Sequence, residues 1–335
     1  MLKKITQLFL SLFFFSTFST QATPTDLHTI KMADLPLVYN LDSMEKEMLI
    51  KDKSGDDYLI GLMTIERSRD LLKSVYKGRF YKEIDSISIA KKFEFGTAFA
   101  QYIKAKMILG KGTGNLSELM INTLRSEKVF EQLHDTTAVI YTNCALAQIY
   151  SRLQKALFPE DFEANSDIPK ESKQNYLKAL VYIEKAELFN QNRSSLMDSI
   201  QIIYTKMLVR YASFPDMLYM DTMKTNCHGI IEVIAIHPAL QFLLPGVYNI
   251  LGNALRASYH KEEALLYYKK GLSVFSHPEN SLTADLNYNI GSDNLGTGKF
   301  DEAFNYLMAA MNIDKEQHVY PNNLSPKYLS ALAYY

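Results

Sequence analysis

Two glycine-rich strings are the first places where this sequence could hold a phosphate group. They are Gly110-Lys-Gly-Thr-Gly114 and Gly296-Thr-Gly-Lys299. A phosphate-binding loop needs the spacing G-x-x-x-x-G-K-[ST] directly after a strand, so that its backbone N–H groups surround the phosphate oxygens. Neither string has that spacing, Phe300 follows Lys299 where Ser or Thr is required, and both strings lie between segments of helical periodicity. We interpret both as turns between helices.

Residues that could hold a metal or carry out catalysis are scattered. Cys227, His228 and His237 match neither C-x-x-C nor H-E-x-x-H, and a zinc site needs more convergent ligands than these. The nucleophile motif G-x-S-x-G is absent. Acidic pairs such as Glu262-Glu263 begin expected helices, where negative charge complements the helix dipole. We therefore expect a protein that is not an enzyme and that uses no cofactor and no metal.

The composition indicates a globular, helical protein. The chain has 335 residues, with 36 Lys and Arg, 37 Asp and Glu, 14 Gly, 10 Pro and no Trp. Low Gly and Pro in a chain of this length favour long, uninterrupted helices. A formal net charge of −1 gives no general attraction to phosphate backbones. We expect protein partners and no nucleic acid.

The first 22 residues have the features of a secretory signal peptide. Lys3 and Lys4 precede an apolar run at 8–18, and a small-residue cleavage site follows at Thr20-Gln21-Ala22. An uncleaved membrane anchor is the alternative, but a spanning helix needs about 20 apolar residues. Cleavage would remove two lysines and no acid, leaving 34 basic and 37 acidic residues, a net charge of −3. We expect export and no membrane insertion after cleavage.

Export makes the redox state of Cys144 and Cys227 relevant. They lie 83 residues apart on expected helices of non-adjacent repeats, whereas bridged Cα atoms must lie within about 7 Å. We expect two buried thiols, and a disulfide is the alternative.

From residue 56 onward, apolar residues recur with the 3.6-residue period of an α-helix, and short polar turns separate the periodic segments. This pattern predicts an all-α array over 56–335. A loosely ordered lead-in is expected at 23–55, with one short helix around Ser43. Besides the repeats described next, helices are expected at 57–75, 80–92, 95–108, 116–133, 176–190, 196–211 and 216–236.

Two units near the C-terminus share a constellation of small residues. Gly252 and Ala264 are twelve residues apart, as are Gly291 and Ala303, and the two units are offset by 39 residues. In each unit the small residues lie on either side of a turn, where they would let two antiparallel helices approach closely. A helix-turn-helix unit with a period of this size indicates a helical solenoid.

At these residues the sequence resembles the tetratricopeptide repeat family. The match is best over 248–275 and 286–313. The resemblance implies a right-handed superhelical solenoid of antiparallel helix pairs, with a partner-binding concave face. The positions that it assigns to that face are Asn249, Asn253, Arg256, Tyr288, Asn289 and Ser292. Asn253 and Asn289 occupy the two positions at which some family members hydrogen-bond a peptide, and Lys327 is the basic residue that could join them.

The expected function is that of a non-enzymatic, exported interaction or sensory module binding a protein or peptide segment. The chain also resembles, loosely, the periplasmic sensory regions of bacterial signalling proteins, which implies a periplasmic location and a role in signal transduction. A small-ligand-binding or enzymatic helical domain and an adaptor for envelope assembly or secretion machinery are the alternatives. A short helix is expected after Pro326, either as a cap on the array or as the start of further repeats.

Overall fold

A computed structural model gives the structure of residues 27–72, 77–111, 115–155, 170–191, 195–213, 217–274 and 281–316. The expected signal peptide, Lys327 and the expected helix after Pro326 lie outside these residues. Within them, every regular element is a helix and no strand occurs. The prediction of an all-α protein is confirmed.

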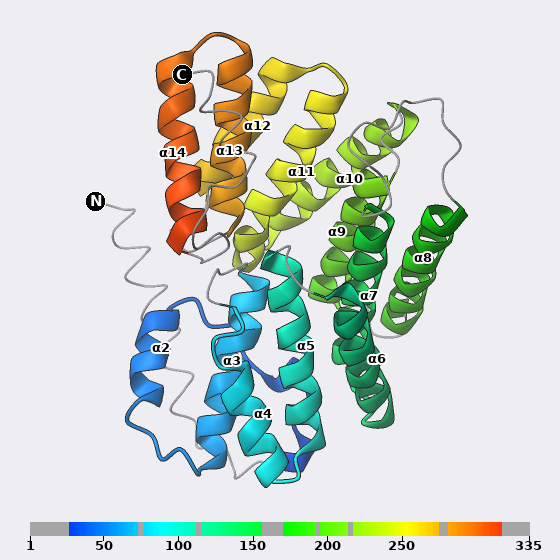
Figure 1. The fold of residues 1–335 in the computed structure, drawn as a ribbon, viewed down its shortest axis with the longest axis vertical. Helices are drawn as coiled ribbons and strands as arrows, with labels where there is room; N and C mark the ends of the chain where they lie inside the picture. The colour runs from blue at the N-terminus through cyan, green and yellow to red at the C-terminus, as the bar shows by residue number, and fades with distance from the viewer. Residues whose placement is uncertain are drawn as a thin grey trace.

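The helices follow one another along the chain (Figure 1). The series begins with two 3₁₀ turns, η1 (Leu27–Thr29) and η2 (Met32–Asp34), and a third, η3 (Pro238–Leu243), precedes α11. The α-helices are α2 (Leu41–Met48), α3 (Asp56–Leu71), α4 (Tyr81–Ala90), α5 (Glu94–Lys111), α6 (Leu116–Gln132), α7 (Thr136–Lys155), α8 (Lys170–Gln191), α9 (Leu196–Ser213), α10 (Met217–Ile236), α11 (Leu244–Ala257), α12 (Lys261–Val274), α13 (Ser281–Gly296) and α14 (Phe300–Glu316).

The helix boundaries have local causes that the sequence supplies. The Asn115 side chain accepts the backbone N–H groups of Ser117 and Glu118, which caps α6. Gly298 has a φ of 76° in the turn between α13 and α14, a conformation that glycine adopts without a steric penalty. The string from Gly296 to Lys299 is therefore an interhelix turn, as predicted.

Contacts between helices follow a regular order. Each odd-numbered helix from α3 to α11 contacts the next odd-numbered helix, so that α3, α5, α7, α9, α11 and α13 form one continuous row. Each even-numbered helix from α4 to α12 packs against the odd-numbered helices before and after it, and α14 packs against α13. We call the row from α3 to α13 the odd-helix layer. In Figure 1 it runs from the blue and cyan helices through green to orange.

The small residues of the C-terminal units lie at close helix crossings. A Cβ atom added to Gly252 would lie 2.4 Å from Cε1 of Tyr268 on α12. One added to Gly291 would lie 2.7 Å from Cγ of Leu307 on α14 and 3.2 Å from the carbonyl oxygen of Ala303. The expected close approach is present, and in the first unit it accommodates the tyrosine ring.

The segment before α3 is packed against the rest of the protein. Met32 and Leu35 are buried, and the backbone N–H of Met32 donates a 2.6 Å hydrogen bond to Oδ2 of Asp135. The helix α2 contains Ser43, where a short helix was expected. This segment extends the hydrophobic core that continues through most of the odd-helix layer.

Both cysteines are buried, and no disulfide joins them. Cys227 Sγ lies 3.6 Å from Sδ of Met207, and burial raises the pKa of the Cys227 thiol to about 12. The expectation of two buried thiols is confirmed. Among the described helices, none has the length and apolar character needed to cross a bilayer.

Candidate functional site

Four of the side chains expected on the concave face, those of Asn249, Asn253, Arg256 and Asn289, converge between α11 and α13. Asn249, Asn253 and Arg256 are spaced four and three residues apart, which places them on one face of α11. Nδ2 of Asn289 on α13 donates to Oδ1 of Asn249 at 2.8 Å and to Oδ1 of Asn253 at 3.3 Å. The Tyr268 hydroxyl of α12 donates to Oδ1 of Asn253 at 2.8 Å. We call these five residues the asparagine cluster.

The hydrogen bonds leave two amide NH₂ groups available in this cluster. A side-chain amide has one carbonyl oxygen and one NH₂ group. The three Asn oxygens all accept, since Arg256 Nη1 donates to Oδ1 of Asn289 at 3.5 Å. Within the described residues, Nδ2 of Asn249 and Nδ2 of Asn253 make no hydrogen bond, and both side chains are half-buried. The cluster is therefore suited to a ligand that offers acceptor oxygens.

A carboxylate lies beside the cluster. Arg256 Nη1 is 3.7 Å from Oδ1 of Asp293, whose Oδ2 is buried without a hydrogen-bond partner in the described residues. Burial raises the pKa of Asp293, and Arg256 opposes that shift. Asp293 thus holds Arg256 close to Asn289, and the cationic side chain remains about one-third exposed.

Three further residues were expected at the site. Tyr288 is half-buried and packs against the small apolar cluster of Leu307, Ala310 and Met311 on α14. Ser292 is half-buried on α13, and Lys327 lies outside the described residues. The structure therefore joins Asn249, Asn253, Arg256 and Asn289, and adds Tyr268, which the sequence did not assign to the site.

No protein-family model matches this chain, and no curated protein sequence is significantly similar to it. In the described part of the chain, no group of three or more His, Cys, Asp or Glu residues is arranged to hold a metal ion.

A second polar site, which the sequence did not reveal, surrounds α3. Glu66, Arg69 and Asp70 are all buried there. The Glu66 carboxylate accepts the backbone N–H groups of Gly78 at 2.5 Å and Phe80 at 2.9 Å, and Arg69 Nη1 lies 3.0 Å from it. Burial raises the pKa of Glu66 to about 7, although both backbone hydrogen bonds lower it.

Arg69 joins α3 to its neighbours. Its guanidinium pairs with Glu45 on α2 as well as with Glu66, and it lies 5.0 Å from the centre of the Phe80 ring. The exposed Arg79 pairs with the second Glu45 oxygen at 3.0 Å. These contacts hold both α2 and the turn at 77–80 against α3.

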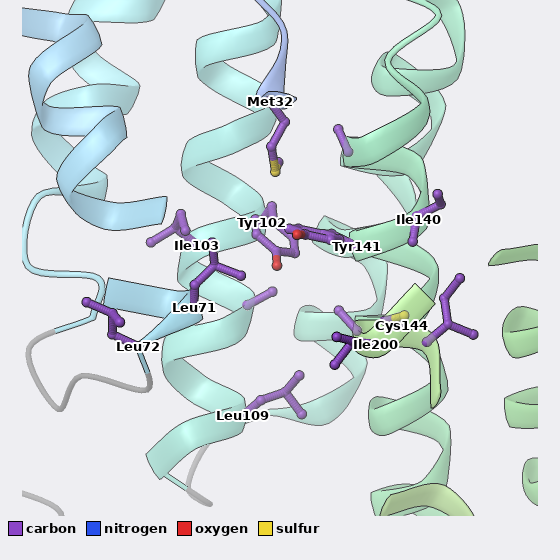
Figure 2. Close-up of a cluster of buried hydrophobic side chains, with 14 of the residues drawn as sticks. Met32, Leu71, Leu72, Tyr102, Ile103, Leu109, Ile140, Tyr141, Cys144 and Ile200 are labelled. Atoms are coloured by element: carbon purple, nitrogen blue, oxygen red, sulfur yellow. The ribbon is translucent and has the colours of Figure 1, made fainter. Parts of the chain in front are cut away.

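Asp70 is the second anionic centre of this site. Its Oδ2 accepts a 2.8 Å hydrogen bond from the Tyr102 hydroxyl, and its Oδ1 lies 3.3 Å from Lys77 Nζ and 3.7 Å from Lys106 Nζ. Figure 2 shows Tyr102 on α5 next to Tyr141 on α7, with Met32 pointing toward both rings. Burial and Asp70 raise the pKa of Tyr102.

The burial of these α3 residues could not be predicted from their spacing. Arg69 and Asp70 lie three and four residues after Glu66, a pattern typical of solvated ion pairs on a helix surface. One signal of burial was present, since apolar residues recur on every side of α3 and leave no wholly polar face. The buried members of that set are Tyr58, Leu59, Leu62, Met63, Ile65 and Leu71.

Proposed function

We propose that this protein is a non-enzymatic interaction or sensory module that binds an extended segment of a partner protein along the odd-helix layer. The asparagine cluster is the observation that carries the proposal. An extended peptide presents a row of backbone carbonyl oxygens, and the cluster offers two amide NH₂ donors and a guanidinium. A non-enzymatic role agrees with hydrogen bonding as the chemistry of this cluster.

We further propose that the helices form a right-handed superhelical solenoid like that of tetratricopeptide repeats. Two observations support this arrangement: the contacts between successive odd-numbered helices, and the glycines at the crossings of α11 with α12 and of α13 with α14. In such an array the helices of one row line one surface. The asparagine cluster would lie on that surface, where a bound segment can contact α11 and α13 together.

Export to a bacterial periplasm is the third element of the proposal. Its support is the charge, length and cleavage chemistry of residues 1–22. Expression with this segment intact, followed by mass spectrometry, tests it. We expect a mature N-terminus at Thr23 in the periplasmic fraction, and retention of residues 1–22 would contradict it.

The binding proposal is tested by changing donors without disturbing the cluster. In Asn249→Asp/Asn253→Asp, each side chain keeps the oxygen that accepts from Asn289 or Tyr268, and its NH₂ group is replaced by an anionic oxygen. The matched control is Asn305→Asp/Asn312→Asp, which adds the same charge at two exposed positions of α14.

The probe is a set of peptides selected from a displayed random library on the wild-type protein. We expect the double variant to bind them at least tenfold more weakly, because its carboxylates repel carbonyl oxygens, while the control binds normally. Unchanged affinity in Asn249→Asp/Asn253→Asp would overturn the proposed binding surface. Equal losses in the variant and the control would assign the effect to net charge alone, and would also overturn it.

A further inference from the structure

The helix α8 has apolar side chains on two opposite faces. Its inner face packs against α7 and α9, and the buried residues of that face are Ala179, Ile183 and Ala186. Leu177, Val181 and Leu188 lie on the opposite side and are 51%, 59% and 61% exposed. Figure 1 shows α8 at one edge of the array. Neighbouring apolar side chains exposed in this way mark an interaction surface.

These exposed residues belong to one narrow strip along the helix. Successive members are alternately three and four residues apart, the spacing of the contact line between two helices in a coiled coil. All members are exposed, and together they span about 25 Å of the helix. We call them the α8 strip: Gln174, Leu177, Val181, Glu184, Leu188 and Gln191.

The outer faces of neighbouring helices in the same layer are mostly polar. Residues with the same spacing on α6 are Glu118, Ile121, Arg125 and Lys128, all exposed. Those on α10 are Asp221, Thr225, His228 and Glu232, also exposed. The apolar character of the α8 strip therefore does not follow from the place of α8 in the layer.

The α8 strip is symmetric about its middle. Leu177 and Leu188 lie at equal distances from that middle, and so do Gln174 and Gln191. If two copies of α8 lie antiparallel across a twofold axis, Leu177 of each copy therefore contacts Leu188 of the other, and the glutamines meet at both ends. A twofold interface needs this property, because both copies use the same surface.

The charges beside the strip also suit a second copy. Within the described residues, the ion pairs of α8 are made by Lys185 and Glu187, which leaves Lys178 and Glu184 for other partners. In the antiparallel arrangement, Glu184 lies opposite Val181 of the second copy and within one helical turn of Lys178 of that copy. The twofold axis produces this pair of opposite charges twice.

We propose that two copies of this protein form a reversible homodimer through antiparallel contact of their α8 strips. The strip is about 25 Å long and about 10 Å wide, which is well below the roughly 800 Å² per partner of a stable interface. The dimer should therefore dissociate in the micromolar range of concentration. The asparagine cluster lies on other helices, so the dimer does not depend on the proposed peptide binding.

Sedimentation velocity of the full mature chain over a range of concentrations tests the dimer. We expect the sedimentation coefficient of the wild type to rise with concentration. In Leu177→Ser/Leu188→Ser the dissociation constant should be higher by about tenfold or more, because four leucines per dimer lose their apolar contacts. The matched control is Leu49→Ser/Ile50→Ser, which changes two residues after α2 that are 76% and 86% exposed. It should associate as the wild type does.

A wild type that sediments as a monomer at every concentration would overturn the dimer and leave a different protein as the occupant of the strip. Equal association of the wild type and Leu177→Ser/Leu188→Ser would also overturn it. Equal losses in this variant and in Leu49→Ser/Ile50→Ser would assign the association to general hydrophobicity, which again contradicts the proposal. Both variants change exposed side chains, so both should fold.

Cross-linking with a short bismaleimide tests the antiparallel arrangement. Residue 177 of one copy should face residue 188 of the other, whereas the two copies of residue 177 should lie about 16 Å apart along the helices. We expect a cross-linked dimer in a mixture of Leu177→Cys and Leu188→Cys, and little in Leu177→Cys alone. The native cysteines are buried and should not react. Equal cross-linking of Leu177→Cys alone would contradict the antiparallel arrangement.

Discussion

Asn289 on α13 donates a 2.8 Å hydrogen bond to Asn249 on α11, forty residues earlier in the chain. The same amide reaches Asn253, and Asn289 is only 7% exposed. It therefore fixes the orientation of two α11 side chains whose own NH₂ groups remain available. Asn289 positions the site, and Asn249 and Asn253 provide its unused donors.

Replacement of this residue should lower stability. In Asn289→Ala, Asn249 and Asn253 lose a shared donor and Arg256 loses an acceptor. We expect a loss of about 1–3 kcal/mol in the free energy of unfolding, measured by urea denaturation. Asn312→Ala, at an exposed position of α14, should change it by less than about 0.5 kcal/mol. Equal effects of the two substitutions would contradict a positioning role for Asn289.

The glycine at the crossing of α11 and α12 should not tolerate a methyl group. In Gly252→Ala the new Cβ would lie 2.4 Å from the Tyr268 ring, so the ring or the helix must move. We expect a loss of about 1–3 kcal/mol in thermal or urea unfolding. Gly229→Ala on α10 has no atom within 4 Å of its new Cβ and should gain about 0.5–1 kcal/mol from helix propensity. A neutral Gly252→Ala would show that this crossing is not tightly packed.

The buried Glu66 should make stability depend on pH. Its pKa rises from 4.5 to about 7 on burial, so between these values the folded protein binds a proton that the unfolded chain does not. The free energy of unfolding should therefore fall as pH rises from 4.5 to 7, by at most about 3 kcal/mol from this group. Arg69, Asp70 and Lys77 are the charged groups facing it.

Glu66→Gln removes this titration and should flatten that part of the stability profile, measured by urea unfolding at successive pH values. Glu47→Gln, at an exposed position of α2, should keep the wild-type slope. Identical slopes for wild type and Glu66→Gln would contradict a raised pKa at Glu66.

The two thiols should be protected in the folded protein. Both are buried, and the pKa of about 12 for Cys227 leaves almost no thiolate at neutral pH. We expect iodoacetamide to label neither cysteine in native buffer and both in guanidinium chloride, as measured by intact-mass spectrometry. Rapid native labelling of Cys227 would show that α10 opens readily.

The sequence predicted the helices well because their signals are local. The apolar period, the turn glycines and the capping asparagines act within a few residues, so the expected range 116–133 corresponds to α6 and 196–211 to the greater part of α9. The asparagine cluster was partly predictable for a related reason. Asn249, Asn253 and Arg256 share a helix face by their spacing, and the repeat offset places Asn289 on the corresponding helix of the next unit.

Pairings across helices could not be predicted in this way. Tyr268 joined the asparagine cluster because the Gly252 crossing brings its ring against α11. Glu66, Arg69 and Asp70 looked like members of a solvated helix surface, and their burial depends on α2, the turn at 77–80 and α5 closing over α3.

The sequence by itself determined the helical class, the turns and one face of α11, because each follows from spacing along a single helix. The tertiary structure decided which side chains lose contact with water and which of them find partners. Those outcomes depend on groups far apart in the chain, as with Asp70 and Tyr102, 32 residues apart and joined by a hydrogen bond. The lack of a partner for the Tyr141 hydroxyl among the described residues follows from the same cause, since hydrogen bonding in a low-dielectric interior is decided by three-dimensional neighbours.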